Sequence, residues 1–200
     1  LRRARAGRRG PNATQLASEA ALMVTALTRP MPSGEEKSEW LVQRADLWRS
    51  VARELPVGDE RRAALHRALA DYTEAMTYGD RTENFTWYKA AVGIAEDIYG
   101  KLAPQVIAFA CSPSSLGEYT HRRNHCAEME VHAAQEMAGS DPAGAAKLVC
   151  KAADHYAVEV PGEGPNMLAR RERRKASYGL MCRRMTEEAA AAVKDEAATP

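Results

Sequence analysis

Residues 33–79, SGEEKSEWLVQRADLWRSVARELPVGDERRAALHRALADYTEAMTYG, contain two amphipathic patterns separated by a short break. Apolar residues recur every three or four positions in each pattern, which is the spacing of one face of an α-helix. The first pattern consists of Leu41, Ala45, Trp48, Ala52 and Leu55, and the second of Leu65, Leu69, Tyr72 and Met76. Pro56 ends the first helix, and Asp59 caps the second. A connection this short predicts an antiparallel helical hairpin.

The middle of the second pattern allows a quantitative expectation. Leu69 lies between Leu65 and Tyr72 on the predicted apolar face. If it is fully buried, its replacement by alanine is expected to lower the free energy of unfolding by about 2–5 kcal/mol.

Proline, glycine and capping residues divide the rest of the chain in the same way. Glu35 and Glu36 follow the capping residue Ser33, and Asp141-Pro142 is a typical helix start. The segment 104–111 is apolar nearly all round, so we expect it at the centre of the core. Further helices are predicted over residues 14–28, 82–99, 104–111, 115–137, 142–158 and 166–198.

The sequence therefore predicts an all-α protein of seven or eight helices in antiparallel hairpins. Alanine dominates the 45% hydrophobic fraction, and residues typical of sheets, such as isoleucine and phenylalanine, are scarce. A helical bundle and a short solenoid-like, helical-repeat stack both fit, because the hairpins recur without a repeated sequence signature. No apolar run reaches about 18 residues, so no membrane span is expected.

Four segments are distinguished along the chain. Residues 1–12 form a basic N-terminal arm or the remnant of a mitochondrial transit peptide, since no acidic residue precedes Glu19. Residues 13–160 form the helical-hairpin body, 161–165 a Pro/Gly loop, and 166–200 a long C-terminal helix with a frayed end. The arm is expected to contact a partner through Arg2, Arg3, Arg5, Arg8 and Arg9.

The four cysteines show no C-x-x-C spacing and no compact framework of the kind found in secreted proteins. We expect free, mostly buried thiols in a reducing compartment. Cys126 adjoins His125, but neighbours in a helix point about 100° apart, so a catalytic Cys–His pair is not expected there.

One face of the helix predicted at 115–137 carries His121, His125, Glu128 and His132, a spacing that could place several ligands on one metal ion. The neighbouring cations Arg122 and Arg123 oppose the binding of a dication. The favoured interpretation is a polar face that meets solvent or a partner, and no metal or other cofactor is expected. His66 and His155 lie beside apolar stripes and are expected to be hydrogen-bonded packing residues.

A basic run near the start of the last helix consists of Arg170, Arg171, Arg173, Arg174 and Lys175. Such a cluster could neutralise phosphates of RNA or anionic lipid head groups. It could equally be a solvated helix face or pair with an acidic neighbouring subunit. The net charge of +1 supplies no general attraction to polyanions.

Neither a nucleotide-binding loop nor a catalytic constellation stands out in the sequence. We therefore expect a non-catalytic accessory or structural subunit of a large multiprotein complex that acts through helix-mediated contacts with other protein subunits. The arginine-rich start favours a mitochondrial location, on the matrix side or peripheral to the inner membrane, with ATP synthase or a respiratory-chain complex favoured. An RNA-associated, mitoribosomal protein using residues 170–175 is one alternative, and a metal-binding helical enzyme centred on His121, His125 and His132 is the other.

Overall fold

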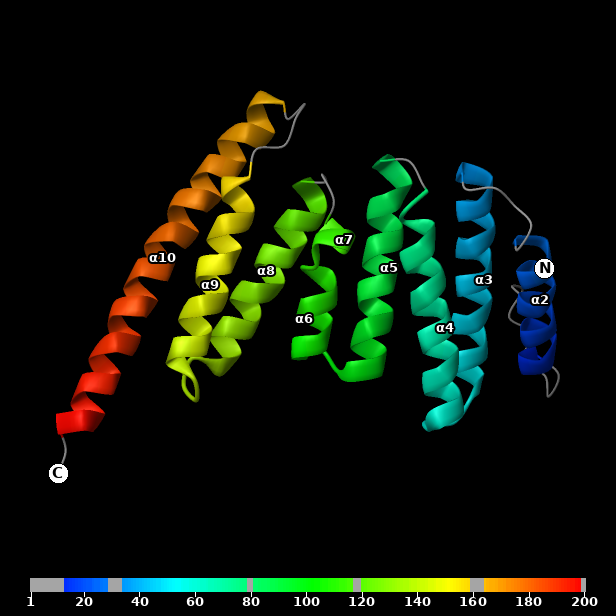
Figure 1. Ribbon diagram of the computed structural model, residues 1–200, viewed down its shortest axis with the longest axis horizontal. Coiled ribbons are helices and arrows are strands. Elements are labelled where there is room, and N and C mark those ends of the chain that lie inside the picture. Colours follow the sequence, from blue (N-terminus) through cyan, green and yellow to red (C-terminus); the bar gives the residue numbers. More distant parts are fainter. Residues whose placement is uncertain (1–12, 29–33, 79–80, 117–119, 159–163, 199–200) are drawn as a thin grey trace. The chain divides into compact units, whose positions relative to one another are not determined.

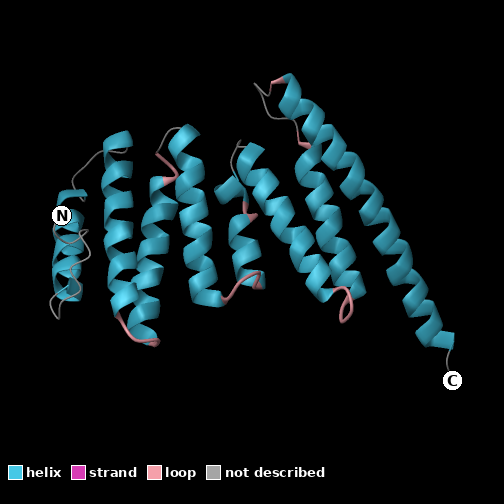
Figure 2. Ribbon diagram, turned by 180° about the vertical axis from the view of Figure 1, so that it is seen from behind, coloured by secondary structure: helices cyan, strands magenta, loops and turns pink. Residues whose placement is uncertain are grey.

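The computed structural model describes residues 13–28, 34–78, 81–116, 120–158 and 164–198 (Figure 1). These ranges form helices joined by turns, with no strand among them (Figure 2). The all-α prediction is confirmed. The predicted N-terminal arm 1–12, the predicted cap Ser33 and residues 161–163 of the predicted Pro/Gly loop lie outside the described residues.

The chain divides into two compact units, residues 1–109 and residues 110–200, and the division falls within the range 13–160 that the sequence suggested as one body. The first unit contains α2, α3, α4, α5 and most of α6, and the second contains α7 to α10. Their bounds are α2 Ala13–Thr28, α3 Glu35–Glu54, α4 Asp59–Ala75, α5 Arg81–Tyr99, α6 Pro104–Ala110, α7 Pro113–Leu116, α8 Thr120–Met137, α9 Pro142–Ala157 and α10 Pro165–Ala198.

The described residues contain nine helices, close to the seven or eight expected, and the predicted helix 115–137 corresponds to two of them. The short helix α7 has its own start signal: Pro113 opens it, and Ser112 Oγ accepts a hydrogen bond from the amide of Ser115 at 3.2 Å. The residue after Leu116 in the sequence is glycine, which disfavours the interior of a helix. The new helix α8 then begins at Thr120.

Within each unit, the extensive helix contacts join neighbours in sequence. In the first unit α2 packs against α3, α3 against α4, and α4 against α5; in the second, α8 packs against α9 and α9 against α10 (Figure 1). A closed bundle would also pack its first helix against its last. Packing between consecutive helices is instead the pattern of a helical-repeat stack, in which each unit of structure contacts its neighbours.

The core of the first unit contains most of the predicted apolar faces. Leu41, Ala45, Trp48 and Ala52 of α3 are buried, which confirms the first pattern except at Leu55, a half-buried residue just after the helix. In α4, Leu65, Tyr72 and Met76 are buried, whereas Leu69 is only partly buried. The premise of full burial at Leu69 is therefore wrong, because Ala68 and not Leu69 occupies the most enclosed position of this turn.

Polar contacts fix how α3 lies against α4. The guanidinium of Arg44 donates two hydrogen bonds to the Asp71 carboxylate, from Nε at 2.8 Å and from Nη2 at 2.6 Å. The hydroxyl of Tyr72 donates to Asp46 Oδ1 at 2.7 Å. Burial, together with this hydrogen bond, raises the pKa of Tyr72 to about 12. These paired groups set the register of the hairpin, because a slip would leave buried polar atoms without partners.

One sequence-based expectation at the end of the first unit is corrected. The segment at α6 is not central in the core, since Val106 and Ile107 are buried but Ala108 is exposed and Phe109 is half-buried. In the described ranges, none of the helices combines the length and the apolar character needed to cross a membrane.

Candidate functional site

The predicted histidine face of α8 does not gather around one point. His121 and His132 are exposed, and His125 is partly buried. The Glu128 carboxylate accepts a hydrogen bond from Arg174 Nη1 at 2.6 Å, so this carboxylate pairs with a cation of α10. The metal-type ligands that the described residues do bring together are a different set.

The expectation of four free thiols is wrong, because the cysteines form two disulfides, Cys111–Cys126 and Cys150–Cys182. The first joins the turn after α6 to α8, with the two Cα atoms 5.2 Å apart. The second joins α9 to α10, with the two Cα atoms 4.8 Å apart. The spacing in sequence concealed both pairs, because turns and helix packing bring together cysteines that are 15 and 32 positions apart.

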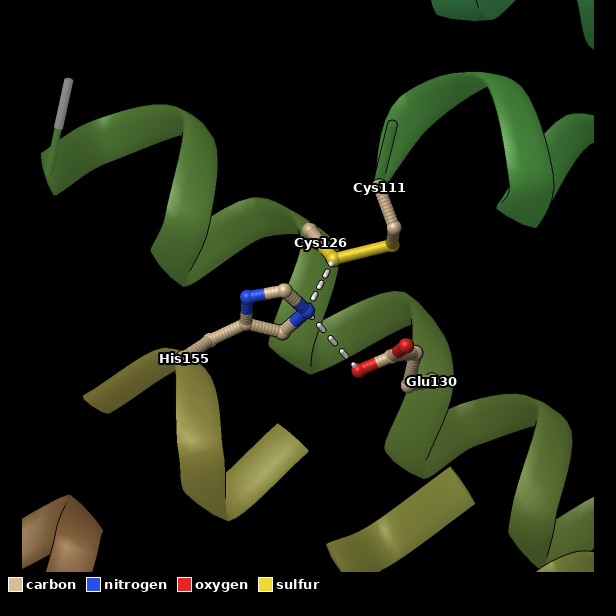
Figure 3. A group of neighbouring side chains, drawn as sticks. All are labelled: Cys111, Cys126, Glu130 and His155. Carbon is tan, nitrogen blue, oxygen red and sulfur yellow. Dashed lines mark hydrogen bonds and ion pairs between the residues drawn. A yellow bond between two sulfur atoms is a disulfide. The ribbon is translucent and has the colours of Figure 1, made fainter. Parts of the chain in front are cut away.

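The Cys111–Cys126 disulfide belongs to a cluster with Glu130 and His155 (Figure 3). Cys126 and Glu130 are four residues apart on α8, so they share one face of the helix. His155 comes from α9, which packs against that face. Its Nε2 lies 3.0 Å from Cys126 Sγ and 3.3 Å from Glu130 Oε2. The cluster thus draws its four side chains from three segments of the second unit.

Burial makes this cluster unusual. Cys126 is fully buried, and Glu130 is only 3% exposed. Neighbouring residues Ala127, Ala152 and Tyr156 belong to a buried apolar cluster between α8 and α9. Glu130 Oε2 nevertheless accepts no hydrogen bond from any residue that the structure describes. An ionised carboxylate in such surroundings is costly unless a cation lies beside it, and His155 Nε2 is the group aimed at it.

The donor atoms of this cluster suit a metal ion of intermediate softness. One ligand atom from each of Cys111, Cys126, Glu130 and His155 lies within 4.8 Å of the others. Zinc binds thiolate, imidazole and carboxylate ligands in a tetrahedron whose corners are about 3.3–3.8 Å apart, given bond lengths of about 2.0–2.3 Å. In the disulfide state the two sulfurs are bonded to each other and are not thiolate ligands.

Sequence reasoning missed this cluster because it compared Cys126 with its neighbour His125. The sequence predicts His155 as a hydrogen-bonded packing residue, and the structure shows that its partners are Cys126 and Glu130. A usable signal was present. Cys126 and His155 lie at similar distances in sequence on either side of the turn around Gly139, so an antiparallel hairpin brings them to the same level.

Part of the predicted basic run lines a pocket with the first histidine of the predicted face. The cavity measures about 240 Å³ and lies among α8, α9 and the start of α10. Its lining residues are Thr120, His121, Asn124, Tyr156, Met167, Arg170, Arg171 and Arg174. Three arginines around one small cavity give it a positive electrostatic potential, to which the N-terminal end of α10 adds.

Two cations of the basic run are engaged within the second unit. Arg171 is buried and donates to the carbonyl oxygen of Val158 at 3.1 Å. Arg174 donates to Glu128 and, at 2.8 Å, to the hydroxyl of Tyr156. Burial raises the pKa of Tyr156, so this hydroxyl stays protonated at neutral pH. The exposed members of the run are Arg170, Arg173 and Lys175.

Compared with protein-family models, curated proteins and solved structures, the chain shows no significant match to any of them.

Proposed function

We propose that this chain is a non-catalytic accessory subunit of a larger mitochondrial complex and acts through helix-mediated contacts, with ATP synthase or a respiratory-chain complex favoured. The observation that carries the proposal is the outward face of α2, the first described helix of a stack in which consecutive helices pack together. The terminal repeats of such stacks normally carry a polar outer face, so an apolar outer face on an end helix calls for a partner to cover it.

The outward face of α2 has the character of a contact surface. Ala21 and Val24 are buried, whereas Leu22 and Met23 are 61% and 68% exposed. Because adjacent residues of a helix point about 100° apart, α2 has apolar side chains both toward the core and toward its outside. An apolar face of a partner helix would bury Leu22 and Met23 and continue the stack by one layer.

The two disulfides bear on where such a complex would lie. Disulfides persist in oxidising compartments and are rare where glutathione and thioredoxin keep thiols reduced. Cys111–Cys126 and Cys150–Cys182 therefore favour a position peripheral to the inner membrane, on the side away from the matrix.

The proposal is tested by placing a charge on the α2 face. Met23→Glu is expected to reduce co-purification of the tagged full-length chain with its partner subunits, because a carboxylate at the centre of an apolar contact must lose its hydration. Ala63→Glu, at an exposed position on α4, is the matched control. If Met23→Glu and the wild type recover the same amount of partner subunits, α2 is not the contact surface.

A second candidate function rests on the arginine-lined pocket. Arg170, the exposed arginine of this pocket, with His121 opposite, could hold a phosphate group of RNA or another polyanion. A charge reversal, Arg170→Glu, is expected to weaken binding to single-stranded RNA and to reduce the dependence of that binding on salt concentration. Binding that is indifferent to salt in the wild type would contradict this candidate.

A further inference from the structure

We propose that Cys111, Cys126, Glu130 and His155 form a redox-controlled zinc site, which holds Zn²⁺ when the Cys111–Cys126 disulfide is reduced and releases it when the disulfide forms. This inference goes beyond the proposed function and does not depend on it. The cluster supplies two sulfurs, one imidazole nitrogen and one carboxylate oxygen, a complete set for a closed tetrahedral zinc site.

The geometry needs little change to accept the ion. The separations of His155 Nε2 from Cys126 Sγ, 3.0 Å, and from Glu130 Oε2, 3.3 Å, are close to the edges of a zinc tetrahedron. The main adjustment is at the two sulfurs, which must move apart from bonding distance once the disulfide is reduced. Cys111 lies in a turn and is partly exposed, so it is the ligand best able to move.

Glu130 is the independent observation that points to a cation at this place. Its side chain is 97% buried, since only 3% is exposed, and Oε2 accepts no hydrogen bond from any described residue. Figure 3 shows the carboxylate directed toward His155 and the disulfide. Buried polar atoms of native proteins are nearly always paired. The group nearest Oε2 is His155 Nε2 at 3.3 Å, an ion pair only if the imidazole is protonated, and a metal ion between the two atoms would ligate both.

The redox step is balanced by a dithiol reductant such as a thioredoxin-type protein. Its two thiols give up two electrons and two protons, the S–S bond of Cys111–Cys126 breaks, and the reductant becomes a disulfide. Zn²⁺ then displaces the two protons from the new thiols and binds both thiolates. Oxidation reverses the sequence and expels the ion, because a disulfide sulfur no longer offers a thiolate. The partial exposure of Cys111 and His155 gives the reductant and the ion an entry path.

The test is a titration of the full chain with Zn²⁺ against a chromogenic zinc indicator, with and without prior reduction. The reduced wild type is expected to bind one equivalent, and the oxidised protein none. Glu130→Gln and His155→Asn each remove a direct ligand. The zinc affinity of each variant should fall by more than roughly 10- to 100-fold, which is the loss seen when a residue hydrogen-bonded to a metal ligand is replaced. With Co²⁺ in place of Zn²⁺, thiolate-to-metal charge-transfer absorption should appear in the wild type and be weakened in Cys111→Ser.

Two matched controls separate the site from other thiols and from unfolding. The double variant Cys150→Ser, Cys182→Ser lacks the other disulfide and should keep one equivalent of zinc. His132→Asn, on the exposed side of α8, should bind like the wild type. Helical circular dichroism verifies that each variant is folded. The proposal is overturned if the reduced wild type binds no zinc, if Glu130→Gln binds it as tightly as the wild type, or if removal of Cys150 and Cys182 alone abolishes binding.

Discussion

At the scale of single residues, the α3–α4 contact combines large apolar side chains with a few polar ones that have defined partners. Leu41 is 1% exposed, and Tyr72 is 3% exposed although its hydroxyl bonds to Asp46. Each type of residue stabilises the hairpin in a different way. Leu41 contributes through burial and close packing, whereas Tyr72 adds a hydrogen bond that its hydroxyl can donate only while it is protonated.

Leu41→Ala is expected to lower the free energy of unfolding by about 2–5 kcal/mol, because it removes buried methyl groups and leaves a cavity. Urea denaturation followed by fluorescence measures it, since Trp40, Trp48 and Trp87 all lie in the first unit. Leu69→Ala is the comparison, and it should cost clearly less at its half-buried position. An equal loss in both variants would contradict the assigned burial.

The raised pKa of Tyr72 predicts that the free energy of unfolding falls at alkaline pH. Its pKa is about 12 in the native protein against about 10 in the unfolded chain, so the native state retains the proton over a range where the unfolded state releases it. The stabilisation is therefore complete below about pH 10 and is lost as the pH rises through 12, by about 3 kcal/mol in all. Tyr72→Phe should lack this part of the alkaline loss. Parallel urea titrations at several pH values from 9 to 12 compare the two proteins, and identical pH dependence would refute the assignment.

At the scale of helices, the short connections decide which elements meet. The Asp141 cap was readable in the sequence and is present, since Asp141 Oδ1 accepts a hydrogen bond from the amide of Gly144 at 2.8 Å. The disulfide partners could not be predicted from the sequence. Helix periodicity indicates which face of a helix a residue lies on, but not which residue of the next helix it lies beside. That pairing depends on the turn between the two helices, whose geometry helix periodicity does not supply.

The Cys150–Cys182 disulfide is expected to hold α10 against α9. The link closes a loop across 32 positions, for which the chain-entropy model gives about 3–4 kcal/mol of stabilisation. The double variant Cys150→Ser, Cys182→Ser should therefore show faster amide hydrogen exchange in α10 and α9. Two internal controls come from the first unit: amide exchange in the α3–α4 hairpin and the unfolding transition followed by tryptophan fluorescence should both stay unchanged. Unchanged exchange in α10 would show that side-chain packing alone, as at Met181 and Met185, holds this helix.

At the scale of the whole molecule, the sequence predicted the all-α class and most helix positions because amphipathic spacing and capping are local signals. It did not predict the division after Phe109, since the boundaries of a compact unit depend on contacts between distant residues. The arginine-lined pocket also depends on contacts between distant residues. The arginines of the basic run were visible as a charge cluster, but the pocket they share with His121 arises only from the packing of α8, α9 and α10.

Membership in a larger assembly is the central claim, and native gel electrophoresis of gently solubilised source cells, with mass spectrometry of the excised bands, tests it most directly. The tagged full-length chain is predicted to migrate inside a large mitochondrial complex, together with the subunits that contact it. Migration as a free species of monomer or small-oligomer size would contradict the account.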